Sequence, residues 1–311
     1  MIRFVILVAA IAPPLLILGY GIAKARGTWK SEAMWNAFLA GAVGALAAVV
    51  CELALEYLSP DDQMGPIAKA ILLAAIPEES VKFFVLVALA EKHVDVRRLQ
   101  DLIVLALAVS MGFAAVENFS YVTSAGGWKM TAALRAVTAV PGHGIDGLAM
   151  GALLVASRLN GGKSLWSARY ALLVPIVLHA AYDFPLFEMQ KHADKIWFGA
   201  AWLAIIAASS IFVIMLCNRI IPRAVAADRA AGRDDSSIET TDRLIIGGII
   251  GLIGGPLLAA SVFYARGLEF ATVAMVLSIF PVALGIDSIF AGLHRRGQRL
   301  SIRNANIDYA H

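Results

Sequence analysis

Charged residues are scarce in this sequence, and the long polar stretches of a soluble protein are missing. Only 16% of the 311 residues are charged, whereas 59% are hydrophobic and the mean hydropathy is +0.75. Soluble domains carry about 25% charged residues, so this composition excludes a soluble enzyme. The apolar residues come in blocks of about 20, the length that crosses a bilayer core of about 30 Å. We therefore expect a polytopic membrane protein.

Cysteines and basic clusters are equally scarce. The two cysteines, Cys51 and Cys217, fall near opposite ends of expected spans on opposite sides of the membrane, so no disulfide between them is expected. The net charge is only +3, and no basic run with interleaved aromatic residues is present. These absences argue against a nucleic-acid partner.

The expected fold class is all-α, with residues 1–311 forming a single integral membrane domain. The longest polar connection, residues 218–243, mixes both charge signs and is expected to be a cytoplasmic loop too short to fold on its own. Hydropathy windows of about 19 residues predict about nine transmembrane helices, at Phe4–Ile22, Met34–Leu58, Ile67–Ala90, Leu102–Ser124, Met130–Ala156, Tyr170–Phe187, Ile196–Cys217, Leu244–Tyr264 and Phe270–Leu293.

Lysine and arginine are unevenly distributed between the two sides of this arrangement. Eighteen lie on the side of residues 218–243 and five on the other. Cytoplasmic loops are enriched in these residues, so the N-terminus is expected outside and the C-terminus in the cytoplasm. The first span also admits a signal-peptide interpretation, because Ala23 and Ala25 have the spacing of a cleavage site, but its apolar run is longer than that of a typical signal.

Ionisable side chains nevertheless occur inside the expected spans. A charged residue costs about 2.5–3.5 kcal/mol at the centre of a membrane helix, so a concentration of them requires mutual pairing, a bound metal or a water-filled cavity. The four-helix core of residues 67–187 is therefore expected to hold the functional site. Eight of the eleven charged residues within spans lie there: Lys69, Glu78, Glu79, Lys82, Glu117, Arg135, Asp146 and Asp183.

Several of these groups are expected at a similar depth in the membrane. The adjacent glutamates of the third span lie near its middle, as do His143 in the fifth span and His179 in the sixth. From a rise of 1.5 Å per residue, Glu117 and Asp183 lie about 6–7 Å nearer the outside. Because successive helices run in opposite directions, this agreement indicates one shared layer of polar groups.

Helical spacing predicts which of these side chains share a face. Glu78 and Glu79 precede Lys82 by four and three residues, so the ammonium can offset one of the carboxylates. His179 and Asp183 are also four residues apart and share a face. Prolines adjoin two of the expected site residues: Pro77 directly precedes the glutamates, and the sequence Pro141-Gly142-His143-Gly144 is expected to break or loosen the fifth span. Such backbone survives in a membrane only where protein buries it or a cavity adjoins it.

Carboxylates and imidazoles gathered in this way can hydrolyse an amide by two routes. They can bind a divalent metal such as zinc, which activates water while another carboxylate acts as general base. Alternatively, a buried glutamate deprotonates water directly and a histidine donates hydrogen bonds to the developing oxyanion. The residues alone leave both routes open.

Four strings follow one another on the third to sixth spans, and in that order they resemble the PrsW-type intramembrane proteases of the CAAX protease and bacteriocin-processing superfamily. The resemblance covers roughly residues 67–187. The strings are Glu78-Glu79-Ser80-Val81-Lys82, Phe113-Ala114-Ala115-Val116-Glu117-Asn118, His143-Gly144-Ile145-Asp146-Gly147 and His179-Ala180-Ala181-Tyr182-Asp183.

The resemblance implies a multi-pass endopeptidase of the bacterial cytoplasmic membrane that cuts a membrane-anchored protein, such as an anti-sigma factor. It implies that Glu78 or Glu79 activates water, with Lys82 and Asn118 as supporting residues. Glu117, His143 and His179 are implied as ligands of zinc or another divalent metal, or else as water and oxyanion partners. Asp183 is implied to orient His179.

This chain departs from structurally known relatives in the superfamily at Glu117, where they carry histidine. Those relatives are similar to glutamate-dependent enzymes that work without metal, so the resemblance leaves both hydrolytic routes open. A proton-coupled transporter or a catalytically silent membrane sensor is the alternative of another class, since both use acidic residues near the midplane. No second copy of the four strings occurs in the chain, which argues against an inverted-repeat transporter.

Overall fold

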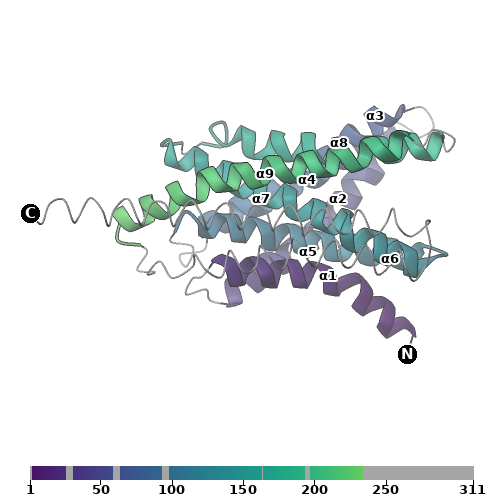
Figure 1. The fold of residues 1–311 in the computed structure, drawn as a ribbon, viewed down its shortest axis with the longest axis horizontal. Coiled ribbons are helices and arrows are strands. Elements are labelled where there is room, and N and C mark those ends of the chain that lie inside the picture. Colours follow the sequence, from purple (N-terminus) through teal and green to yellow (C-terminus); the bar gives the residue numbers. More distant parts are fainter. Residues whose placement is uncertain are drawn as a thin grey trace, which may run out of the picture. The chain divides into compact units, whose positions relative to one another are not determined.

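Helices make up almost all of the chain that the structure describes. The computed structural model describes residues 2–25, 31–58, 64–92, 98–162, 164–192 and 197–233. No strand occurs in these ranges, which confirms the all-α class for them, and their helices belong to one compact unit, Met1–Asp235. The elements, drawn in Figure 1, are α1 (Ile2–Ala25), α2 (Ser31–Leu58), α3 (Pro66–Ala68), the π-helical η2 (Lys69–Ala75), α4 (Ile76–Lys92), α5 (Asp101–Ser124), α6 (Trp128–Val137), α7 (Ala139–Leu159), α8 (Arg169–Lys191) and α9 (Trp197–Ala230).

Within the described ranges, six helical segments are long and apolar enough to cross a membrane. They coincide with six of the expected spans. The third expected span corresponds to Pro66–Lys92, which is divided among α3, η2 and α4, and the eighth and ninth expected spans lie outside the described residues. The six segments are Arg3–Ile22, Glu32–Leu58, Asp101–Ser124, Trp128–Leu159, Arg169–Lys191 and Trp197–Ala230.

Prolines produce irregular backbone beside the glutamates and histidine, although one break differs from its expected position. The fifth span breaks at Thr138 (φ −123°, ψ −75°), between α6 and α7, and His143 lies inside regular helix. The break precedes Pro141 because proline cannot donate to the carbonyl of Val137, four residues earlier. Near Pro77, the irregularity takes the form of η2, which ends two residues before it; π-helical turns are frequent at functional sites.

The seventh span is longer than expected, because α9 continues through Ala230 and includes much of the expected loop at residues 218–243. Ile220 and Ala224 pack in a buried cluster with residues of α5 and α7. Asp228 is fully buried and accepts hydrogen bonds from the backbone N–H groups of Leu99 and Gln100, at 2.9 and 3.4 Å. The polar composition of residues 218–230 did not indicate that one face of this part of α9 is buried by tertiary contacts.

The central helix is α5, which packs against α1, α2, α4, α6 and α7. Every residue of α5 from Asp101 to Ala115 is buried. In contrast, α2 and α9 expose large apolar side chains such as Val50 and Ile211, as expected of helices that face lipid. The cysteines, Cys51 and Cys217, are both free. The other helices thus surround α5, and the outer ones expose apolar side chains that suit contact with lipid.

Glycines allow α2 and α5 to approach closely. A Cβ atom on Gly112 would overlap the carbonyl oxygen of Phe38, and one on Gly41 would overlap the carbonyl oxygen of Val109. Small residues at such crossings are typical of membrane helix pairs. The α2–α5 contact therefore depends on these two positions.

We expect Gly112→Leu to lower the thermal unfolding midpoint of the protein in detergent, because overpacking a close contact costs about 1–3 kcal/mol. Gly19→Leu is the matched control, since no atom lies within 4 Å of the position of its Cβ. Fluorescence-detected thermal unfolding measures both. Equal midpoints for the two variants would contradict the close approach of α2 and α5.

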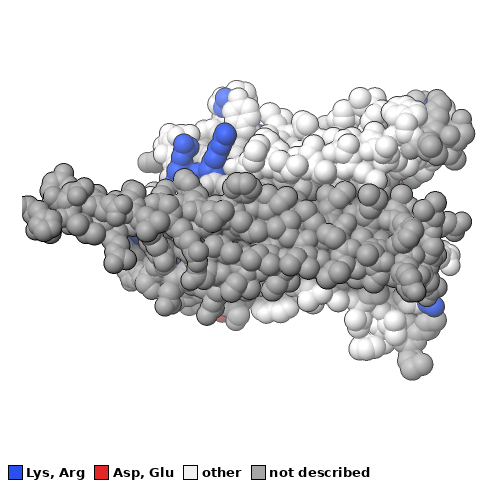
Figure 2. Space-filling view, in the orientation of Figure 1, with Lys and Arg blue, Asp and Glu red and all other residues white. Residues whose placement is uncertain are grey.

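Several arginines lie near one set of helix ends. Figure 2 shows Lys and Arg at the end of the view where α9 finishes and also at the opposite end, while most of the visible described surface carries no charge. Arg219, Arg223 and Arg229 lie in the last part of α9, Arg158 lies near the end of α7 and Arg169 begins α8. The apolar surface between the ends is suited to a lipid environment.

Candidate active site

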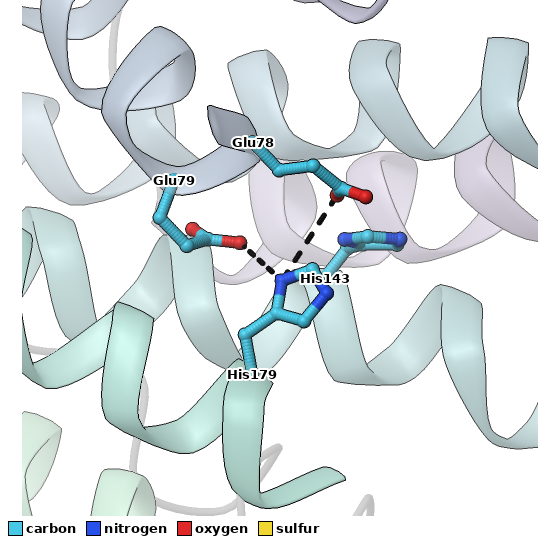
Figure 3. Close-up of side chains that lie close together, drawn as sticks. All are labelled: Glu78, Glu79, His143 and His179. Atoms are coloured by element: carbon cyan, nitrogen blue, oxygen red, sulfur yellow. Dashed lines mark hydrogen bonds and ion pairs between the residues drawn. The ribbon is translucent and has the colours of Figure 1, made fainter. Parts of the chain in front are cut away.

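Four ionisable side chains from three helices meet inside the bundle. Glu78 and Glu79 lie in the first turn of α4, His143 comes from α7 and His179 from α8. Figure 3 shows both carboxylates directed toward the imidazoles. One ligand-type atom from each residue lies within 4.8 Å of the corresponding atoms of the others, and all four residues are buried. The expected convergence of the motif-bearing helices is therefore present.

His179 lies between carboxylates on both of its ring nitrogens. Its Nδ1 atom is 2.7 Å from Oε1 of Glu79 and 3.9 Å from Oε2 of Glu78. Its Nε2 atom is 3.2 Å from Oδ2 of Asp183, one helical turn along α8. Carboxylates that are ionised only accept hydrogen bonds, so two such partners favour a ring that carries hydrogen on both nitrogens. Asp183 lies where an orienting residue for His179 is expected.

Lys82 lies on the same face of α4 as the two glutamates and is completely buried. Its ammonium donates to Oε1 of Glu79 at 2.7 Å and to Oε2 of Glu78 at 3.3 Å. The same nitrogen lies 3.0 Å from Nδ1 of His143 and 4.1 Å from the centre of the Phe113 ring. The expected offset of a carboxylate is present, and the contact with His143 is an addition that helical spacing could not predict.

His143 links Lys82 to a second acidic group. Its Nε2 atom contacts Oε2 of Glu117 on α5. A charged ammonium has no lone pair and can only donate, so Nδ1 of His143 accepts from Lys82 and Nε2 carries the hydrogen that is donated to Glu117. Both nitrogens of His143 are therefore engaged with the protein, and Glu117 contacts the far side of the ring from the two adjacent glutamates.

Arg135 on α6 holds Glu117 and was assigned no role from the sequence. Its Nη2 atom lies 2.9 Å from Oε1 of Glu117, and its Nε donates to Oδ1 of Asn118 at 3.0 Å. The guanidinium also lies 4.0 Å from the centre of the Tyr121 ring. The pairing depends on how α6 packs on α5 and on the break before α7. Its only sequence signal was its position as an arginine inside an expected span.

Asn118 contacts the site indirectly, through Arg135. Its side-chain nitrogen donates to the carbonyl oxygen of Ala10 at 2.7 Å, and its oxygen accepts from Arg135. Asn118 is completely buried, so it joins α1 to the arginine that holds Glu117. Its amide is not directed at the glutamate pair.

We expect Arg135→Met to lower the cleavage rate about tenfold, the order of effect seen when a supporting partner of an active-site residue is lost, because Glu117 would lose the ion pair that fixes its position beside His143. Arg135→Lys keeps the charge but not the forked geometry, so we expect an intermediate rate. Arg158→Met, near the end of α7, is the matched control. Rates for Arg135→Met equal to those of the control would contradict a positioning role for the arginine.

The donor types at the cluster suit a metal ion, but its members are already bound to another cation. Glu78, Glu79, His143 and His179 could hold a divalent metal as carboxylate and imidazole ligands. This set differs from the predicted one, because it contains the two adjacent glutamates in place of Glu117, which Arg135 and His143 hold aside.

The ammonium of Lys82 contacts three of those four donors, at 2.7, 3.0 and 3.3 Å. A metal bonds such atoms at about 2.0–2.2 Å through their lone pairs, and a dication beside a buried ammonium is strongly repelled. The residues as arranged therefore do not fit a divalent ion.

The fold and the site together define a class: a polytopic helical membrane protein with a buried cluster of carboxylates and imidazoles. Residues 29–216 match the PrsW family intramembrane metalloprotease, and the chain belongs to this family. The match confirms the resemblance carried by the four strings.

Curated relatives agree with this assignment. The chain is 32% identical to Protease PrsW of Halalkalibacterium halodurans over 61% of this chain and 86% of the relative. It is 29% identical to Protease PrsW of Shouchella clausii over 63% and 94%, and 31% identical to that of Bacillus subtilis over 60% and 85%. No solved structure is significantly similar to the chain. These relatives support a membrane protease.

Proposed function

We propose that this protein is an intramembrane endopeptidase in which Glu78 activates the attacking water. The observation that carries the proposal is the meeting of Glu78, His143 and His179 among helices that are long and apolar enough to cross a membrane. Polar groups at such a depth are costly and mark functional sites. Membership of a protease family supports hydrolysis of a peptide bond as the reaction.

Accessibility favours Glu78 over Glu79 as the base. The side chain of Glu78 is 10% exposed, whereas that of Glu79 is completely buried. Oε1 of Glu79 accepts from both Lys82 and His179 at 2.7 Å, so this carboxylate holds its neighbours in place. A general base must come within hydrogen-bond reach of the water it deprotonates, and Glu78 is the member of the pair that a substrate and its water can reach.

In the proposed reaction, the oxygen of water bonds to the carbonyl carbon of the scissile peptide while Glu78 takes a proton from that water. The carbon–nitrogen bond then breaks, and the proton held by Glu78 passes to the leaving amine. His179, with hydrogen on both nitrogens, places positive charge beside the oxyanion that forms in between. Fixed charge of this kind is often the largest contribution to such catalysis. Asp183 keeps the imidazole oriented.

The substrate we propose is a protein anchored in the same bilayer, such as an anti-sigma factor. A site enclosed by membrane helices suits a substrate that spans the same bilayer. We also propose that the chain has nine spans in the bacterial cytoplasmic membrane, with its N-terminus outside. Arg158 lies near the end of α7, Arg169 begins α8, and Arg219 and Arg223 lie in the last part of α9, which supports a cytoplasmic position for these helix ends.

The proposal is tested by cleavage in defined vesicles. Purified protein is reconstituted with single-span membrane proteins from the same genome, in water enriched in ¹⁸O, and the fragments are analysed by mass spectrometry. We expect the wild-type protein and Glu91→Gln, a control on the exposed end of α4, to release fragments with ¹⁸O in the new carboxyl group. The double variant Glu78→Gln with His179→Ala should release none.

Equal fragment yields from the double variant and the wild-type protein would overturn the catalytic assignment. Complete absence of labelled fragments from wild-type protein, across the whole panel of substrates, would favour a transporter or a silent sensor. The labelled oxygen separates hydrolysis from contaminating fragments made before reconstitution.

A further inference from the structure

The buried ammonium of Lys82 lies at the centre of the group that a metal would require. Its distances to Glu79, His143 and Glu78 are 2.7, 3.0 and 3.3 Å. Its side chain is completely buried, and the Phe113 ring lies against it at 4.1 Å. A lysine is rarely buried to this extent unless it is paired, and here its hydrogen-bond partners within the described residues, Glu78, Glu79 and His143, all belong to the cluster.

The contacts of this ammonium use the lone pairs that a metal would need. Oε1 of Glu79 accepts from both Lys82 and His179. Nδ1 of His143 accepts from Lys82, while its Nε2 is engaged with Glu117. A neutral imidazole offers one lone pair, so His143 cannot ligate a metal through either nitrogen while both contacts persist. Nδ1 of His143 and Oε1 of Glu79 are thus committed to Lys82, whereas Oε2 of Glu79 is buried without a hydrogen-bond partner.

We infer that Lys82 is the resident cation of this site and takes the place of a divalent metal. It holds Glu79 in place beside His179 and fixes His143 as the tautomer that carries hydrogen on Nε2. Lys82 acts through these residues and is a positioning residue, not a catalytic one. The inference deepens the proposed function and rests on it, because it assumes that this cluster is the site of hydrolysis. It implies that hydrolysis needs no added metal.

Removal of the ammonium should convert the cluster into a metal site. In Lys82→Met, an apolar side chain of similar length leaves the lone pairs of Glu79 and His143 free beside those of Glu78 and His179. Lys82→Arg keeps a cation at the same position and is the matched control. A difference in metal binding between Lys82→Met and Lys82→Arg therefore reports the loss of the positive charge at residue 82, and not the effect of replacing the lysine.

The experiment measures metal binding by the full chain in detergent after removal of metal with a chelator. Each protein is titrated with Co²⁺, followed by its visible absorption, and with Zn²⁺, followed by elemental analysis after desalting. We expect wild-type protein and Lys82→Arg to retain neither ion, and Lys82→Met to retain about one ion per chain, as a single closed ligand set predicts. Adding His143→Ala and His179→Ala to Lys82→Met should abolish this gain.

A wild-type protein that retains about one ion per chain, lost on His143→Ala, would overturn the inference, because the metal and the ammonium would then share the site. A folded Lys82→Met that binds no ion would also overturn it. Chelators should leave wild-type cleavage unchanged.

A second measurement needs only the wild-type protein and covers the case in which Lys82→Met fails to fold. Nitrogen-15 NMR of labelled histidine reports which ring nitrogen carries hydrogen, and the signal of His143 is assigned with His143→Gln. We expect an unprotonated Nδ1 and a protonated Nε2 in wild-type protein. Hydrogen on Nδ1 would overturn the inference. Neither readout uses a substrate, so failure of the proposed proteolysis would be seen separately in the fragment assay.

Discussion

Glu78→Gln is expected to lower the rate of substrate cleavage about 10²–10⁴-fold, the usual contribution of a positioned general base. Glutamine has nearly the same shape but cannot take a proton from water. The stability of the protein should change little, because Lys82 retains its shorter contact with Glu79 and Glu78 is the partly exposed member of the pair. The loss should therefore fall on the chemical step.

Two measurements on the same preparation check this expectation. Initial rates are taken with the substrate that gives labelled fragments, and the unfolding midpoint is taken without substrate. Glu91→Gln on the same helix serves as the control for substitution of a carboxylate. A Glu78→Gln rate within a few-fold of this control would assign water activation to another residue, with Glu79 as the first alternative.

Glu79→Leu is expected to destabilise the protein by about 3 kcal/mol, the lower end of the cost of breaking a buried ion pair, because Lys82 keeps its 3.3 Å contact with Glu78. Lys82 and Nδ1 of His179 would both lose their 2.7 Å contacts with this carboxylate. Activity should fall as well, but together with the folded fraction. This behaviour separates the two adjacent glutamates, since only the substitution of Glu78 leaves the fold intact.

Substitution of Lys82, the partner of Glu79 in the ion pair, provides the internal control. Adding Lys82→Met to Glu79→Leu removes the buried ammonium that has lost its shortest carboxylate contact, so the double variant should recover much of the lost stability, as replacement of whole buried ion pairs by apolar groups often does. Denaturant titrations in detergent measure the three proteins. If Glu79→Leu and the double variant were equally destabilised, the ion pair would not be the source of the loss.

The sequence predicted most of the helices because lipid imposes a simple requirement on length and hydropathy. Pro141 showed that the fifth span would break, and its missing N–H explains why the break lies at Thr138. The end of α9 was not predictable from composition, since Asp228 is buried by contacts with Leu99 and Gln100, which are distant in the chain. This stretch is polar in sequence, but tertiary contacts bury one face of it.

The site shows the same division. Glu78, Glu79, Glu117, His143, His179 and Asp183 could be selected from the sequence because ionisable groups are costly in a membrane helix and stand out wherever they occur. Their helical spacing also predicted the pairing of Lys82 with the two glutamates. Which helix faces which is not contained in spacing, so the role of Arg135 beside Glu117 was missed.

The sequence by itself determined that this is a helical membrane protein, and it predicted acids and imidazoles at one depth, because hydropathy and charge are properties of each residue. Only the tertiary structure decided how those groups are paired. The contact of Lys82 with His143 joins residues 61 positions apart, and it sets the tautomer of the ring and occupies the lone pair with which that ring would bind a metal. Such contacts depend on the distance between helices to within a few tenths of an ångström, which side-chain packing fixes and residue order does not.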